Sequence, residues 1–170
     1  MEHTLTADDG VITLRPLSAG DSERYRLLRN QDRNRVCFFY SEIITPKAQH
    51  RWYRQYLATA QDYMFSVYDK DQRFLGGAAL YHFEADSAEF GRLLIDRERA
   101  GKGTGLRVLQ LLCRLAAQHF GLSRLRLDVY EDNLPARKTY EKAGFTVQNR
   151  SLSPASDRYL LYMEKNLSAQ

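Results

Sequence analysis

The sequence predicts a mixed α/β fold in which helices cover both faces of one sheet. Short segments with alternating apolar residues are separated by segments with helical spacing. Pairs of strands come first, and strands and helices alternate in the second half of the chain. With 170 residues, of which 44% are hydrophobic, the chain can form one domain with a sizeable core. We therefore expect a single domain over 1–170, with 1–10 as a mobile tail.

The first half is expected to contain two helices and four strands. A helix over 21–30 has apolar residues at helical spacing. A second helix over 46–57 begins where Thr45 can cap the helix and Pro46 fits its first position. Strands are predicted over 11–17, 63–69, 73–83 and 88–96, of which 63–69 and 73–83 form a hairpin.

The second half is expected to alternate between helices and strands. A helix over 104–120 has one polar stripe and is apolar on its other sides, so it should cover a sheet. A helix over 133–143 should end at Gly144. Strands over 125–129, 145–148 and 158–165 complete the predicted sheet.

A basic, glycine-rich turn over 97–105 lies between a predicted strand and a predicted helix. Gly101, Gly103 and Gly105 let the backbone approach a ligand closely, and amides at a helix start favour an anion. The spacing does not fit a P-loop, because Leu106 and Arg107 follow the last glycine in place of Lys and Ser/Thr. It does not fit a dinucleotide-binding motif either, which needs a third glycine at Leu106 or Val108. We expect a polyphosphate ligand held by another fold.

Charge and cysteine content restrict the class of protein. The formal net charge of +4 favours anionic ligands, but the basic residues are dispersed, which argues against a nucleic-acid surface. Cys37 and Cys113 are isolated, so we expect neither a disulfide nor a metal site, and a cytoplasmic location. No leader and no apolar run of about 20 residues is visible, so we expect no membrane association.

Two motifs resemble the signature motifs of the GNAT superfamily of acyl-CoA-dependent N-acetyltransferases. The first comprises Leu94-Ile95 and the turn 100–105, and the second comprises Asn133-Leu134-Pro135-Ala136, Tyr140 and Gly144-Phe145. The resemblance spans about residues 11–165. It implies the GNAT fold, a largely antiparallel central sheet with splayed strands, and acetyl-CoA as the cofactor. One position departs from the family pattern, which usually has Gln or Arg where this chain has Ala100.

The resemblance implies a set of cofactor-binding residues. Backbone groups of one strand would pair with the pantetheine arm, amides of the turn would hold the pyrophosphate, and Asn133 would hydrogen-bond the arm. The expected set is Leu93, Leu94, Ile95, Ala100, Gly101, Lys102, Gly103, Thr104, Gly105, Asn133, Ala136 and Tyr140.

Tyr140 has two interpretations. Asn133 and Tyr140 are seven residues apart, which places them on nearly the same helix face, so one extended ligand could touch both. By resemblance, the Tyr140 hydroxyl would protonate the departing thiolate. The alternative is a half-buried aromatic side chain that packs with Ala136 and Ala143.

Glu89 and Asp128 lie at positions that different branches of the family use for the general base. Either could take a proton from the ammonium substrate, directly or through water. Alternatively, Glu89 is a salt-bridge partner of Arg92, and Asp128 pairs with Arg126 or caps a backbone group. The proton could then leave through a water chain or bulk solvent.

The acceptor amine is expected to bind in the N-terminal half, where aromatic and basic residues gather. The pattern resembles family members that acetylate amino sugars. Aromatic side chains with neighbouring cations suit a sugar ring, or a base with phosphate. The expected residues are Arg29, Tyr40, His50, Trp52, Tyr81 and His82. The alternative interpretations are a core role for Trp52 and a surface position for His50.

The expected function is transfer of an acetyl group from acetyl-CoA to a primary amine of a small molecule. The acceptor would be an amino sugar or a nucleotide-linked amino sugar, attacking directly without a covalent enzyme intermediate or a metal. One alternative is acetylation of a protein N-terminus, a lysine or a polyamine. Another is a non-catalytic acyl-CoA-binding module. We expect no nucleic-acid or membrane partner, and a monomer or homodimer.

Overall fold

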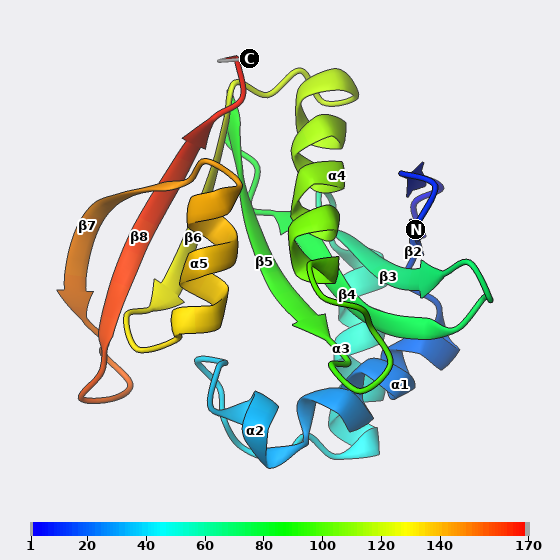
Figure 1. Cartoon of the computed structure of the whole chain (residues 1–170). Coiled ribbons are helices and arrows are strands. Elements are labelled where there is room, and N and C mark those ends of the chain that lie inside the picture. The colour runs from blue at the N-terminus through cyan, green and yellow to red at the C-terminus, as the bar shows by residue number, and fades with distance from the viewer. Residues whose placement is uncertain (1, 169–170) are drawn as a thin grey trace.

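The computed structural model describes residues 2–168 and contains one eight-stranded sheet (Figure 1). The strand order is β1-β2-β3-β4-β5-β6-β8-β7, and the β5–β6 pair is parallel while every other described pair is antiparallel. The strands are β1 (Ala7–Asp8), β2 (Ile12–Pro16), β3 (Tyr63–Asp69), β4 (Phe74–Tyr81), β5 (Ser87–Ile95), β6 (Arg124–Tyr130), β7 (Thr146–Leu152) and β8 (Tyr159–Asn166). The helices are α1 (Ala19–Arg29), α2 (Asp32–Arg35), α3 (Pro46–Ala58), α4 (Thr104–Gln118) and α5 (Leu134–Lys142). The predicted mixed, largely antiparallel sheet is confirmed.

Helices cover both faces of the sheet, as predicted. In Figure 1, α4 and α5 lie on the viewer's side of the sheet and α3 lies behind it. Apolar side chains of α4 and α5 join a core with Phe65 and Phe90 of the strands. On the other face, tyrosines of α1 and α3, including Tyr25, pack against Met64 and Ala79. No helix within residues 2–168 is long and apolar enough to cross a membrane.

Local signals explain where the helices begin. The Ser18 hydroxyl accepts a hydrogen bond from the Asp21 amide at 3.1 Å, and the Thr45 hydroxyl accepts one from the Ala48 amide at 3.1 Å. Pro46 follows in the first helical turn, where its missing N–H costs nothing. The predicted helix start at Thr45-Pro46 is therefore confirmed.

The stretch 1–10, expected as a mobile tail, makes specific contacts with the rest of the domain over residues 2–10, while Met1 lies outside the described residues. Ala7–Asp8 pairs with β2, and Asp9 accepts an ion-paired hydrogen bond from Arg107 at 3.1 Å. The His3 ring packs on Phe65 with centroids 4.8 Å apart, and its Nε2 lies 2.9 Å from the Met64 carbonyl oxygen. A two-residue strand shows no periodicity and these contacts are remote in sequence, so the pattern could not predict them.

β5 and β6 diverge, and this positions the functional site. They pair only from Ser87 to Glu89, and beyond that point β5 continues along β4 while β6 runs along β8. The register of β5 on β4 shifts near Arg92, which has a left-handed φ of 55°. The Tyr25 hydroxyl donates a hydrogen bond to the Arg92 carbonyl at 2.8 Å and holds this irregularity. One edge of β5 after Glu89 therefore faces an opening and not a neighbouring strand.

Gly76→Ala is expected to lower the free energy of unfolding by about 2–3 kcal/mol. Gly76 has a φ of 147°, and an added Cβ would lie 1.9 Å from the Leu94 carbonyl oxygen, so β4 and β5 would have to separate. The control is Gly20→Ala in α1, where the added Cβ meets only the Ser18 hydroxyl oxygen at 3.9 Å. This change should stabilise by roughly 0.5–1 kcal/mol. Chemical denaturation of both variants tests this, and equal stabilities would contradict it.

Candidate active site

A cleft of about 1100 Å³ opens between the diverging strands β5 and β6. Its walls come from β5, the glycine-rich turn, the start of α5 and the segment between α1 and α3. Figure 1 shows the two strands separating above α2, with α5 on one side and the turn before α4 on the other. The cleft therefore brings together the two motifs and the N-terminal segment, which are remote in sequence.

The turn before α4 has the geometry of an anion site. Gly103 precedes the helix with a left-handed φ of 80°, and no side chain caps the first turn, which holds no acidic residue. The Thr104 hydroxyl donates to the Gly101 carbonyl at 2.7 Å and closes the turn. A Cβ added at Gly101 or Gly103 would meet no atom within 4 Å, so these positions keep the surface of the cleft open. Free amides and a helix dipole at this position suit phosphate groups.

Two cations reinforce this end of the cleft. Arg97 and Lys102 line the cleft, both are exposed, and neither has a carboxylate partner among residues 2–168. Arg99, one residue before Ala100, lies 3.6 Å from the Asp96 carboxylate and so is engaged at the base of the turn. The residues present fit the pyrophosphate of coenzyme A through backbone amides and these two side chains.

The expected pantetheine-binding residues also line the cleft. Leu93, Leu94 and Ile95 form its β5 wall, and the Leu94 side chain is buried in the core, so the strand offers backbone groups. Asn133 uses its Oδ1 to accept a hydrogen bond from the Ala136 amide at 3.4 Å, which caps α5. Asn133 thus serves as a helix cap, and its Nδ2 remains available to a ligand.

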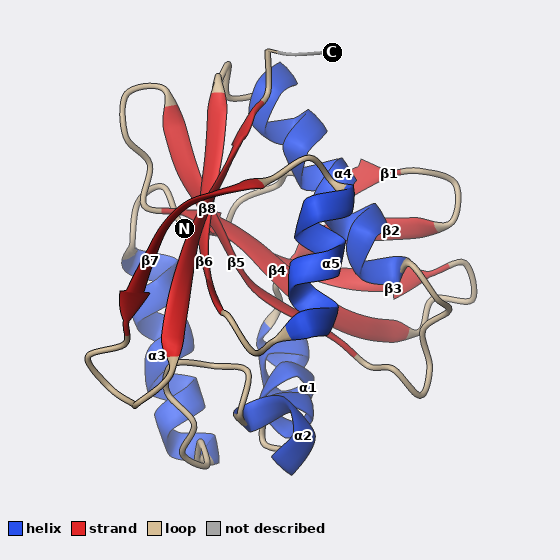
Figure 2. Cartoon of the chain, turned by 60° about the vertical axis from the view of Figure 1, so that its left-hand side comes forward, coloured by secondary structure: helices blue, strands red, loops and turns tan. Residues whose placement is uncertain are grey.

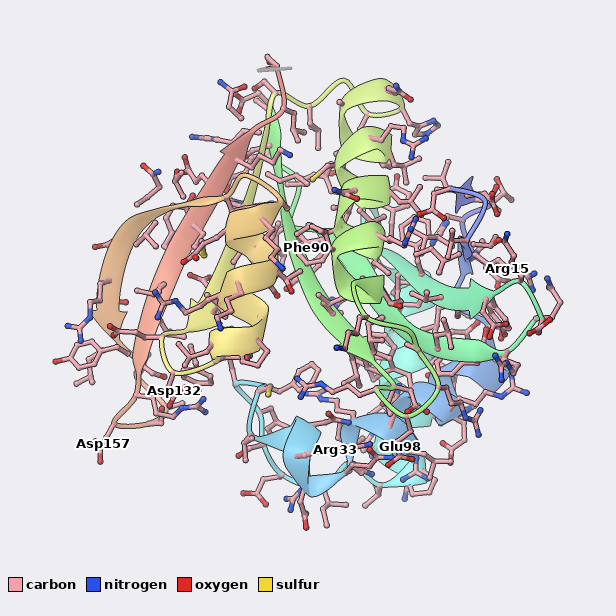
Figure 3. The ribbon with its side chains drawn as sticks, in the orientation of Figure 1. Arg15, Arg33, Phe90, Glu98, Asp132 and Asp157 are labelled. Carbon is pink, nitrogen blue, oxygen red and sulfur yellow. The ribbon has the colours of Figure 1, made fainter. Side chains whose placement is uncertain are left out.

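Tyr140 is packed as the structural interpretation predicts, and it also lines the cleft, where the catalytic interpretation requires it to lie. Its side chain is buried, and the ring packs edge-on to Phe90 with centroids 6.1 Å apart and against Phe145 at 6.2 Å. Figure 3 labels Phe90 on β5, where it faces α5. Tyr140 lines the cleft, and among residues 2–168 its hydroxyl makes no hydrogen bond. Burial, and secondarily the Cys37 thiol, raises the pKa of the Tyr140 phenol, so this group is a protonated donor at neutral pH.

Glu89 and Asp128 both lie in the cleft wall. The Glu89 carboxylate accepts a hydrogen bond from the Tyr81 hydroxyl at 3.1 Å, and His82 Nδ1 lies 2.7 Å from its other oxygen. Burial, together with the neighbouring Glu89 charge, raises the pKa of the Asp128 carboxyl. Either group could accept a proton from an ammonium ion in the cleft.

The alternative salt bridges predicted for these carboxylates are not the ones that form among the described residues. Arg92 pairs with Asp62 through two hydrogen bonds of 2.6 and 3.0 Å, and not with Glu89. Arg126 pairs with Glu84 at 3.0 Å. Both bridges involve partners on neighbouring elements that no local sequence spacing could identify.

The structure brings four of the six expected acceptor residues into the cleft, namely Arg29, Tyr40, Trp52 and Tyr81. His50 does not line it, because the preceding residue, Gln49, is the one that turns inward and hydrogen-bonds Ser22 at 2.8 Å. Successive helix residues point about 100° apart, so His50 is exposed. The alternative surface position holds for His50.

His82 was expected to line the acceptor site and does not, whereas Trp52 lines the cleft and also has the packing role given as its alternative. His82 lies outside the cleft lining, and it contacts the site through Glu89. Trp52 lines the cleft and also stacks on Tyr56, with centroids 5.4 Å apart and planes 9° apart. Trp52 is therefore both a packed aromatic and a cleft wall.

The segment between α1 and α3 contains cleft residues that the sequence did not identify. Cys37 and Asn34 line the cleft, and α2 lies beside α1 in Figure 2. Arg33 pairs with Glu98 of the glycine-rich turn at 3.0 Å, and Figure 3 shows the two side by side below the cleft. On the other side, Arg158 donates to the Val36 carbonyl at 2.7 Å. A four-residue helix is too short for a periodic signal, so this segment could not be placed beforehand.

Comparisons with known proteins agree with this geometry. A family model described as an acetyltransferase (GNAT) domain matches residues 12–146. No curated protein sequence matches the chain.

Solved structures show the same fold. The spermidine N-acetyltransferase from Vibrio cholerae, in complex with CoA and spermine, is 22% identical with a TM-score of 0.85, over 94% of this chain and 98% of that chain. A dodecameric structure of the Vibrio cholerae enzyme is 22% identical with a TM-score of 0.77, over 94% and 96% of the two chains. Because the family model covers most of the chain, the protein belongs to the GNAT acetyltransferase family and is an acyl-CoA-dependent N-acetyltransferase that acts on amines.

Proposed function

We propose that this enzyme transfers an acetyl group from acetyl-CoA to the primary amine of a nucleotide-linked amino sugar. The single observation that carries the proposal is Arg29, a partly buried cation at the acceptor side of the cleft with no carboxylate partner among residues 2–168. An acceptor that brings its own anionic group, such as a diphosphate, would complete this site.

Two contacts hold the Arg29 guanidinium in place. Its guanidinium lies 4.3 Å from the centre of the Phe38 ring and donates to the Tyr40 carbonyl at 3.2 Å. Burial lowers the pKa of the Arg29 guanidinium, although arginine stays charged at neutral pH. A desolvated cation with only a neutral oxygen partner favours binding of an anion.

The aromatic residues around Arg29 support a ring-containing acceptor. Trp52, Tyr81 and Tyr40 line this part of the cleft. The Arg92 guanidinium lies 4.2 Å from the Tyr81 ring centre and 5.5 Å from the Trp52 ring centre, which holds these planes together. Flat apolar surfaces with a few polar groups suit a sugar ring or a base.

The proposed chemistry is direct attack by the acceptor nitrogen. When bound, acetyl-CoA supplies the acetyl group as an activated thioester. Glu89 accepts a proton from the ammonium form of the acceptor, so that the nitrogen lone pair becomes free. Asp128 adds negative charge that attracts the ammonium group. The Tyr140 hydroxyl donates its proton toward the position of the leaving sulfur.

A polyamine is the second candidate acceptor. The similar Vibrio cholerae structures are of spermidine N-acetyltransferases, and Glu89 and Asp128 would attract a polycation. Arg29 opposes this candidate, because it places a cation without a carboxylate partner among residues 2–168 at the acceptor side of the cleft. The proposal therefore ranks an anionic acceptor above a polycation.

Arg29→Leu is expected to raise the KM for a nucleotide-linked amino sugar by roughly 10- to 100-fold, because one charge-assisted hydrogen-bond site is lost. The KM for the same amino sugar without the nucleotide, and the KM for acetyl-CoA, should change little. Release of thiol from acetyl-CoA measures all three.

The matched control is Arg51→Leu, which removes an exposed arginine of α3 outside the cleft and should leave every constant unchanged. A higher kcat/KM for spermidine than for the nucleotide-linked amino sugar in the unmodified enzyme would overturn the proposal in favour of the polyamine. If Arg29→Leu raised only the KM for acetyl-CoA, Arg29 would be assigned to the cofactor-binding site.

A further inference from the structure

We propose that His82 is a positioning residue that holds the Glu89 carboxylate in place and aimed into the cleft. The inference deepens the proposed function, since it rests on Glu89 as the group that accepts the proton of the acceptor. His82 itself lies outside the cleft lining.

Glu89 is held from one side by two consecutive residues of β4 and the turn after it. The Tyr81 hydroxyl donates to Oε1 at 3.1 Å, and His82 Nδ1 lies 2.7 Å from Oε2. An ionised carboxylate only accepts hydrogen bonds, so Nδ1 carries the hydrogen of this contact. Each oxygen has a second lone pair, which leaves both able to receive a proton from the cleft. The two donors therefore orient the carboxylate without blocking it.

The backbone of His82 is arranged for this contact. Its φ is 45°, a left-handed conformation that few residues other than glycine adopt. The Arg126 guanidinium donates to the His82 carbonyl at 2.7 Å and also pairs with Glu84 at 3.0 Å. Strained backbone that surrounding groups hold in place is typical of functional sites. The strain turns the imidazole of His82 back toward Glu89.

Packing does not explain this conformation. The His82 side chain is 71% exposed, whereas the Glu89 side chain is 20% exposed. The imidazole touches the Tyr81 ring edge-on, with centroids 4.6 Å apart, and buries little surface itself. An exposed histidine in a strained conformation that reaches a mostly buried carboxylate gains most from that one hydrogen bond.

The charges around Glu89 explain why two donors are needed. On β6, Asp128 places a like charge near Glu89, while Arg126 is engaged with Glu84 and the His82 carbonyl. On β5, Arg92 is engaged with Asp62 and stacks over the Tyr81 ring. Direct stabilisation of the Glu89 carboxylate thus comes from the β4 side, through Tyr81 and His82.

The test compares His82→Gly with His82→Asn by pH–rate profiles, with kcat and KM determined separately. Glycine accepts the left-handed backbone but has no donor, whereas asparagine tolerates that backbone and carries an amide nitrogen near the position of Nδ1. His82→Gly should move the acidic limb of kcat upward by about 0.5–1 pH unit, as expected for one lost charge-assisted bond that is partly solvent-screened. His82→Asn should retain the profile of the unmodified enzyme, and neither variant should change the KM for acetyl-CoA.

Two further variants separate the possible failures. His50→Asn removes an exposed imidazole outside the cleft and should change nothing. Glu89→Gln should abolish the acidic limb. If His82→Gly keeps the unmodified profile while Glu89→Gln loses it, the role of His82 is overturned and that of Glu89 stands. If Glu89→Gln also keeps the pH–rate profile of the unmodified enzyme, the proposed roles of both Glu89 and His82 are overturned. If the unmodified enzyme acetylates no nucleotide-linked amino sugar but does acetylate another amine, the acceptor proposal fails, and His82 is tested with that amine.

Discussion

Tyr140→Phe is expected to lower kcat by about 10²- to 10⁴-fold while leaving the affinity for acetyl-CoA nearly unchanged. The phenylalanine keeps the ring that packs between Phe90 and Phe145 and loses only the hydroxyl. That hydroxyl has no partner among residues 2–168 that would be left unsatisfied. The substitution should therefore lower kcat without lowering the stability of the fold. Stopped assays of thiol release and a titration with CoA measure the two quantities.

The direction of the pKa shift adds a second expectation for Tyr140. Burial raises the pKa of its phenol, so the group stays protonated through neutral pH and should cause no loss of kcat up to about pH 10. Tyr159→Phe is the matched control, because Tyr159 is exposed on β8 and does not line the cleft. A Tyr140→Phe variant with an unchanged kcat and an unchanged melting temperature would remove the assignment of Tyr140 as the proton donor.

Regular elements could be predicted from the sequence because their signals are local. The strand over 63–69 has the observed bounds, and the helix over 46–57 begins at Pro46 as expected. Alternation, helical spacing and caps act within a few residues, so one sequence is enough to identify them. β1 and α2 were missed since elements of two and four residues are too short to show any period. Their positions depend on remote contacts, such as Arg33 with Glu98.

The candidate site also contains residues that local sequence signals could predict and residues that they could not. The glycine-rich turn and the Asn133 to Tyr140 helix face are continuous in sequence, and every residue expected there lines the cleft. The acceptor side depends on where individual side chains point. Gln49 turns inward where His50 was expected, and His82 is diverted by its left-handed φ. Neither spacing nor residue type carries that information.

The charges in the cleft are separated along its length, which gives the site a direction. Arg97 and Lys102, which have no carboxylate partner within residues 2–168, lie with the glycine-rich turn, whereas Glu89 and Asp128 lie where β5 and β6 begin to part. Tyr140 lines the same cleft from α5. Under the proposed function, the glycine-rich turn would hold the phosphates of acetyl-CoA, Tyr140 would donate a proton to the leaving thiolate, and the carboxylates would accept the proton of the acceptor. Under the proposed function, cofactor binding and proton acceptance belong to opposite ends of the cleft.

Gly105→Asp is expected to weaken the binding of CoA without lowering the stability of the free enzyme. Gly105 lies in the first turn of α4, where an added Cβ would meet Leu93 and Thr139 at 3.8 and 3.9 Å, which is ordinary contact. A carboxylate there interacts favourably with the helix dipole and stabilises the fold by roughly 0.3–1 kcal/mol. The melting temperature of the free enzyme should therefore stay the same or rise. The same charge repels the phosphates of coenzyme A, by about 3–4 kcal/mol at a partly solvated site.

Calorimetric titration with CoA should therefore show an affinity lower by roughly 10²- to 10³-fold for Gly105→Asp. Gly105→Ala is the control for the side chain without the charge. Its Cβ fits, and the gain in helix propensity of about 1 kcal/mol should raise the melting temperature while CoA still binds. If Gly105→Asp bound CoA as tightly as Gly105→Ala, the phosphates could not lie at the start of α4. The cofactor would then have to bind along another wall of the cleft, and the roles of Arg97 and Lys102 would change with it.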